Sequence, residues 1–172
     1  MPTSNNSIQR DHHIIDRSLE YLTEAELTRQ IGYGVGDWPI VLVKELIDNA
    51  LDATEQTARA PVIDIIVTDD YVQVCDNGPG LPATVIEKAL DYTVRISDKT
   101  VYVSPSRGQL GNALKCVFAA PFVVDGNEGR VVITTADTAH DIRLRLDRIA
   151  QRPVIEHQRE MVKNAKNGTQ VA

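Results

Sequence analysis

The chain has 172 residues, a length typical of one domain, and 42% of them are hydrophobic, which is enough for an ordinary buried core. Its formal net charge of −6 at pH 7 argues against a broad nucleic-acid-binding surface. It has no apolar run near the ~20 residues of a membrane span and no secretory signal, so we expect a cytoplasmic protein without a membrane partner. Cys75 and Cys116 have no metal-ligand spacing and are expected to be buried, reduced thiols.

The pattern along the chain predicts a flexible N-terminal segment over residues 1–15 and one domain over residues 16–172. Thr23 and Glu26 form a capping-box pattern, and Asp37 is a suitable N-cap with Pro39 in the first turn of the next helix. Helices are predicted over residues 19–31, 38–58, 81–92 and 108–121, the last ended by Pro121, and strands over 62–68, 71–75, 130–135, 140–146, 153–157 and 168–172. We therefore expect an α+β fold, a two-layer sandwich of a mixed, mostly antiparallel sheet covered on one face by helices.

The second predicted helix carries a polar stripe opposite its apolar face. Glu45, Asp48, Asn49 and Asp52 recur at i, i+3, i+4 and i+7, so they share one side of the helix. One interpretation is a solvated acidic face, which is common on helices. The other is a site for a hard cation such as Mg²⁺, because carboxylate and amide oxygens are suitable ligands for that ion.

The loop 76–80, Asp-Asn-Gly-Pro-Gly, directly follows a predicted strand. Asn-Gly after a strand is typical of a hairpin turn, but here a helix rather than a strand is predicted to follow. Asp76 could instead accept a hydrogen bond from an exocyclic amine such as that of adenine. Gly78 and Gly80 would let the main chain approach a flat ring closely.

A second glycine loop, Arg-Gly-Gln-Leu-Gly over residues 107–111, leads into the predicted fourth helix. A glycine loop at a helix N-terminus suits a phosphate, because main-chain N–H groups and the helix dipole face the anion. An ordinary loop-to-helix joint would have the same appearance. The loop lacks the spacing of a P-loop, and no parallel βαβ unit surrounds it as a dinucleotide fingerprint requires.

In this combination and order, the motifs resemble the GHKL ATPase superfamily with its Bergerat ATP-binding fold. Its members include gyrase B subunits, chaperones of the Hsp-ninety class, MutL-type repair proteins and histidine kinases. Residues 45–53 look like its N-box, 76–80 like its adenine-contacting box and 108–111 like its phosphate-binding glycine box, so residues 16–172 would form a GHKL-type ATP-binding domain. Residues 45–53 and 107–111 look most similar to the ATP-binding domain of the topoisomerase VI B subunit.

The resemblance implies a role for each matching residue. Asn49 would hold Mg²⁺ bridging the ATP phosphates, Glu45 would be the general base that activates water, and Asp76 would bind the adenine amine beside Thr169. The phosphate-binding glycine box of the superfamily usually ends in a further glycine. In this sequence Asn112 and Ala113 follow Gly111 instead. The nucleotide-binding set that the resemblance implies is Asn49, Asp52, Asp76, Gly78, Gly80, Arg107, Gly108, Gln109, Leu110, Gly111, Asn112, Lys115 and Thr169.

The implied function is Mg²⁺-dependent ATP binding with slow ATP hydrolysis, acting as an ATP-gated switch of topoisomerase or repair type. ATP would order residues 93–107 as a lid and favour a homodimer or larger complex, while DNA would be contacted only through other domains or subunits. Hydrolysis is expected to depend on such additional parts. Two alternatives stay open: a histidine-kinase-like catalytic domain, although His12 and His13 lack a long dimerisation helix pair, and a non-hydrolysing nucleotide-binding module.

Overall fold

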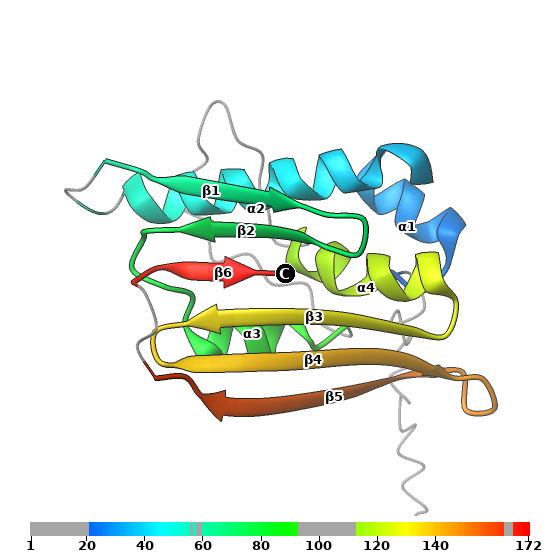
Figure 1. Cartoon of the computed structure of the whole chain (residues 1–172). Coiled ribbons are helices and arrows are strands. Elements are labelled where there is room, and N and C mark those ends of the chain that lie inside the picture. Colours follow the sequence, from blue (N-terminus) through cyan, green and yellow to red (C-terminus); the bar gives the residue numbers. More distant parts are fainter. Residues whose placement is uncertain (1–20, 56, 58–59, 93–112, 164–166) are drawn as a thin grey trace, which may run out of the picture.

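The computed structural model describes residues 21–55, 57, 60–92, 113–163 and 167–172 (Figure 1). The predictions made for the N-terminal segment 1–15, for the lid over residues 93–107, for the glycine loop over residues 107–111 and for Asn112 lie outside these ranges. No helix in the described ranges is long and apolar enough to cross a membrane.

The first helix forms where the capping box predicts it. In α1 (Glu24–Ile31) the Thr23 hydroxyl accepts a hydrogen bond from the Glu26 main-chain N–H at 3.3 Å, which satisfies one of the donors exposed at a helix start. Gly32 ends the helix with φ of +83°, a conformation that costs glycine little.

The helix that carries the acidic stripe begins and ends slightly differently from the prediction. Asp37 is the last residue of a 3₁₀ turn, η2 (Val35–Asp37), and α2 runs over Trp38–Glu55 rather than to residue 58. Trp38 is buried, and its indole N–H donates to the Tyr33 carbonyl at 2.9 Å. This hydrogen bond joins the start of α2 to the glycine-rich segment before it.

Within the described residues the sheet has six strands in the order β1-β2-β6-β3-β4-β5, and each ladder between them is antiparallel (Figure 1). The prediction of an α+β fold with one sheet is confirmed, while the expectation of a mixed sheet is wrong. The C-terminal strand lies in the middle of the sheet, between β2 and β3, and so joins the early hairpin to the later meander. The strands are β1 (Ile63–Val67), β2 (Val72–Asp76), β3 (Glu128–Thr135), β4 (Thr138–Asp147), β5 (Arg152–Met161) and β6 (Thr169–Val171).

The remaining helices are α3 (Ala83–Ala89) and α4 (Ala113–Asp125). Pro121 does not stop α4 as predicted, because the helix continues for another turn and buries Phe122 in the core. The helix ends instead at Gly126, which has φ of +83° and donates its N–H to the Phe122 carbonyl at 2.7 Å. The apolar contacts of the last turn thus outweigh the hydrogen bond that proline cannot make.

The α-helices of the described ranges, α1 to α4, lie on one face of the sheet, as the two-layer prediction requires (Figure 1). One apolar cluster joins α1, α2 and α4, with Leu27 and Trp38 at its centre. A second cluster packs Phe118 of α4 onto Ile133 and Val171 in the middle of the sheet. Cys116 is buried and Cys75 is half-buried, and both are free thiols.

The helix layer and the sheet come very close together where Gly129 of β3 faces Phe122 of α4. A Cβ atom added to Gly129 would lie 2.4 Å from the main-chain nitrogen of Phe122 and 2.9 Å from its Cα. Neither neighbouring atom belongs to a flexible side chain, so only a shift of the helix could make room. Glycine is therefore required here for the packing of the layers.

We expect Gly129→Ala to lower the free energy of unfolding by about 2 kcal/mol, as overpacking of a rigid core does. Urea unfolding followed by circular dichroism measures it. Gly36→Ala is the matched control, because its added Cβ would meet nothing within 4 Å, and it should change the stability by less than about 0.5 kcal/mol. An equal loss of unfolding free energy in the two variants would show that the contact between α4 and β3 does not cause the loss in Gly129→Ala.

Candidate nucleotide site

Asp76, the last residue of β2, has its carboxylate held in place by two main-chain groups. Its Oδ1 atom accepts hydrogen bonds from the Gly78 N–H at 2.7 Å and from the Thr169 N–H at 3.2 Å. Within the described residues the other oxygen, Oδ2, makes no hydrogen bond. The carboxylate is thus oriented by the protein and has one oxygen available to accept a hydrogen bond from a ligand.

The turn before β6 contacts this strand end through glycine. Gly168 has φ of +107°, and a Cβ atom there would lie 1.9 Å from the Asp76 carbonyl oxygen. Only glycine fits such an approach of two main chains. The sequence pattern pointed to Thr169, and the structure shows that its main-chain N–H, rather than its hydroxyl, bonds to Asp76.

Two polar side chains that the sequence analysis did not single out hold the loop 76–80 in place. The Thr135 hydroxyl accepts from the Leu81 N–H at 2.8 Å and donates to the Leu81 carbonyl at 3.2 Å. On the other side, the Asn77 side chain accepts from the Val62 N–H and donates to the Ala60 carbonyl, both at 3.0 Å. Asn77 belongs to a recognisable motif, but no local pattern marks Thr135, which is 54 residues away from Leu81 along the chain.

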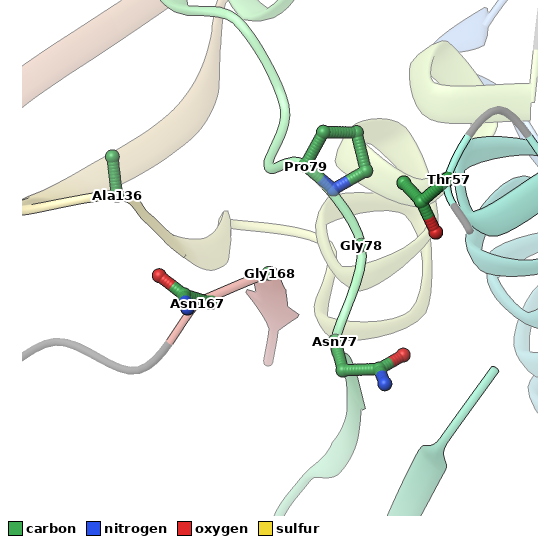
Figure 2. A pocket seen from close by; sticks show the side chains of 7 residues that line it. All are labelled: Thr57, Asn77, Gly78, Pro79, Ala136, Asn167 and Gly168. Carbon is green, nitrogen blue, oxygen red and sulfur yellow. The ribbon is translucent and has the colours of Figure 1, made fainter. Parts of the chain in front are cut away.

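A pocket of about 400 Å³ opens beside this loop. Figure 2 shows loop residues 77–79 between Thr57, just beyond α2, and the pair Ala136 and Asn167 from the two turns opposite. Asp76 does not line the pocket itself but lies directly before its lining residues Asn77 and Gly78. The lining residues are Thr57, Asn77, Gly78, Pro79, Ala136, Asn167 and Gly168.

The acidic stripe of α2 is more buried than a solvated face would be. Asp48 is buried and accepts the Lys44 ammonium at 2.6 Å, while Glu45 Oε1 lies 3.5 Å from the same nitrogen. The other Glu45 oxygen, Oε2, is buried and makes no hydrogen bond in the described part of the chain. Asn49 and Asp52 are half-buried.

The stripe alone would not enclose a metal ion. Among the described residues, no three His, Cys, Asp or Glu side chains gather closely enough to hold one. Mg²⁺ commonly takes only one or two protein oxygens and completes its shell with water and phosphate. The predicted role of Asn49 as a ligand of Mg²⁺, through its amide oxygen, stays a prediction.

Lys115 lies in α4, one turn after the glycine loop. Its side chain is buried, and the ammonium donates to the Asp91 carbonyl and lies 5.9 Å and 5.8 Å from the ring centres of Tyr21 and Tyr92. Burial raises the pKa of Tyr92 well above its usual range, so its hydroxyl stays neutral and donates to the Lys115 carbonyl at 3.2 Å. The predicted contact of Lys115 with the nucleotide stays a prediction, as do those of residues 107–112.

Curated proteins that are B subunits of type 2 DNA topoisomerase 6 match this sequence. The protein from Natronomonas pharaonis is 29% identical over 141 residues, which are 77% of this chain and 17% of the relative. The protein from Archaeoglobus fulgidus is 33% identical over 105 residues, which are 57% of this chain and 17% of the relative. The protein from Halobacterium salinarum is 31% identical over 134 residues, which are 71% of this chain and 16% of the relative.

This chain is related to the B subunit of type 2 DNA topoisomerase 6. The matches span 16–17% of the length of these relatives. No protein-family model matches the chain. Among solved structures, the N-terminal domain of a DNA repair protein aligns with 76% of this chain and 33% of its own chain, at 24% identity and a TM-score of 0.41.

The Thr135 hydroxyl can be tested with an isosteric variant. We expect Thr135→Val to lower the free energy of unfolding by about 1–3 kcal/mol, because it leaves the Leu81 N–H and carbonyl without their partner. Hydrogen exchange of the Leu81 amide should accelerate. Thr134→Val, the adjacent residue on the opposite face of β3, is the control, and the same loss in both variants would contradict a specific role for Thr135.

Proposed function

We propose that this chain binds Mg·ATP and hydrolyses it slowly, as an ATP-gated switch within a larger assembly of topoisomerase type. The observation that carries the proposal is the geometry of Asp76. Its Oδ1 is saturated by the Gly78 and Thr169 main-chain N–H groups, which leaves Oδ2 as an acceptor for an exocyclic amine. The pocket of about 400 Å³ beside this loop falls within the ~300–1,000 Å³ of ordinary small-molecule sites.

The loop residues favour a flat base. A Cβ atom at Gly78 would lie 2.9 Å from Asp76 Oδ1, so glycine keeps the main chain close to this carboxylate. Asn77 and Thr135 hold the loop from either side, and the acceptor oxygen is therefore oriented before a ligand arrives. Such preorganisation lowers the entropic cost of binding.

Glu45 is the residue proposed to act on water. Asn49 would hold Mg²⁺ through its amide oxygen, and the ion when bound would neutralise charge on the phosphates. Glu45 Oε2 is buried and has no hydrogen-bond partner in the described residues. A carboxylate oxygen in that state is a strong acceptor for a water O–H, and Glu45 would orient that water and take its proton.

The relation to the topoisomerase 6 B subunit supports the assembly part of the proposal. Because the matched region is a small fraction of those relatives, ATP turnover would be coupled to work by further domains or subunits. The chain would act as an ATP-dependent homodimer or as part of a larger complex, and any contact with DNA would be made by other domains or subunits. The acidic net charge of this chain agrees with that division.

The base-binding role of Asp76 can be tested by titrating the purified chain with a fluorescent ATP analogue in Mg²⁺. Asp76→Asn should weaken binding on the order of tenfold or more. In one orientation of the amide its NH₂ group would face the main-chain N–H groups of Gly78 and Thr169, and in the other it would face the amine of the base. Asp64→Asn on β1 is the control. Asp64 pairs with Cys75, so its side chain lies on the opposite side of the sheet from that of Asp76. Unchanged binding of Asp76→Asn would remove Asp76 from the site.

The hydrolytic role of Glu45 needs a separate measurement. Glu45→Gln should bind the analogue as the wild type does and lose phosphate release by about 100-fold or more, because the amide cannot accept a proton. Both are measured on the full chain by fluorescence and by a phosphate assay. Binding without turnover in the wild type would favour the non-hydrolysing nucleotide-binding module instead.

A further inference from the structure

The two outer strands of the described sheet differ in how they are protected against pairing with another strand. β5 forms one edge, and its Pro153 has no N–H to donate. The charged residues of β5 are Arg152, Glu156, Arg159 and Glu160. Proline and charged side chains are common means of blocking an exposed edge. β1 forms the other edge (Figure 1), and its five residues include one charge, Asp64, and no proline.

The main-chain groups that β1 directs away from the sheet belong to three apolar residues. The Thr68 N–H donates to the Tyr71 carbonyl at 3.0 Å, so it points towards β2. Because these groups alternate in direction along an antiparallel strand, those of Ile63, Ile65 and Val67 point outward. Within the described residues no strand pairs with this side of β1. Each of the three residues thus has an N–H and a C=O group available to an added strand.

The side chains of the same residues form an apolar row beside the helix layer. Ile65 is in register with Val74, and Val74 is in register with Val171 of the core cluster under α4, so all three lie on the helix-covered face. Helix α2 packs against β2, and β1 lies one strand further out. Ile65 is therefore 45% exposed and Val67 70% exposed. A strand added at this edge would cover these side chains together with the main-chain groups.

A second copy of the chain supplies a strand that is complementary to this edge in both hydrogen bonding and charge. With a two-fold axis at Ile65, that residue faces its own copy, and Ile63 faces Val67 of the second copy. Both members of each pair direct their N–H and C=O groups outward, so each pair exchanges two hydrogen bonds. On the other face, Asp64 lies opposite Ile66 of the second copy. This register therefore places no like charges directly opposite each other.

We propose that the β1 edge is a self-association surface, at which two copies of this chain join their sheets through antiparallel β1 strands centred on Ile65. This inference goes beyond the proposed function and needs no nucleotide. Two strands of five residues bury less area than the ~1,200 Å² at which stable interfaces begin, so the dimer should dissociate in the micromolar to millimolar range. Within a larger assembly, a high effective concentration would favour the same contact.

Charges placed on the two-fold axis test the register. The full chain is studied without nucleotide by sedimentation velocity, from micromolar to millimolar concentration. Ile65→Lys and Ile65→Glu should each weaken the dimer by about tenfold or more, because residue 65 then faces a like charge. An equimolar mixture of the two variants should dimerise more strongly than either variant alone, because lysine then faces glutamate. Val154→Lys, on the opposite edge of the sheet, is the matched control and should leave dimerisation unchanged.

Hydrogen exchange examines the same contact in the wild type and does not depend on the folding of a variant. On dilution from dimer to monomer, the amides of Ile63, Ile65 and Val67 should lose protection, whereas that of Ile66, which points towards β2, should keep it. Protection of the three amides in the monomer would mean that the chain itself covers this edge, and the proposal would be wrong.

Three results of the sedimentation experiment would also overturn the proposal. They are a wild type that stays monomeric at millimolar concentration, a dimer that Ile65→Lys leaves intact, and a mixture of the lysine and glutamate variants that associates no better than either alone. If the variants do not fold, the exchange of the wild-type amides decides. Because nucleotide is absent throughout, failure of ATP binding would remove the proposed function and leave this inference to be judged by these results.

Discussion

The candidate site depends on one carboxylate oxygen that joins two segments far apart in the sequence. Asp76 Oδ1 accepts the Gly78 N–H from its own loop and the Thr169 N–H from β6, 93 residues away. A carboxylate that accepts charge-assisted hydrogen bonds from main-chain groups is strongly held. This pair of bonds fixes the end of β2, the turn before β6 and the orientation of the remaining oxygen together.

The neighbouring structure is built around that junction. Gly168 permits main-chain contact with the Asp76 carbonyl, and Thr135 holds the Leu81 end of the loop to β3. Because β6 lies between β2 and β3, the same strand that donates to Asp76 also unites the two parts of the sheet. Asn77, Gly78 and Gly168, which line part of the pocket, thus belong to segments that these contacts hold in place.

The acidic stripe shows how burial distinguishes residues that look equivalent in the sequence. Asp48 is buried and paired with Lys44, Glu45 has one oxygen near the same cation and one buried oxygen without a hydrogen bond in the described residues, and Asn49 is half-buried. A row of like charges on a helix would weaken it if all were solvated acids. The structure instead places a counter-ion where the stripe is most buried, and this gives Glu45 surroundings different from those of Asp48.

The sequence by itself determined what depends on neighbouring residues. The Thr23–Glu26 cap, the hairpin of β1 and β2, the helical stripe of α2 and the Asp76 loop all follow from spacings of a few residues, because caps, turns and periodicity act locally. Only the tertiary structure decided that β6 enters the centre of the sheet, that α4 passes Pro121 to bury Phe122, and that Thr135 holds Leu81. These features arise from contacts between segments tens of residues apart, and their stability comes from burial and hydrogen bonds that exist only once the layers have packed together.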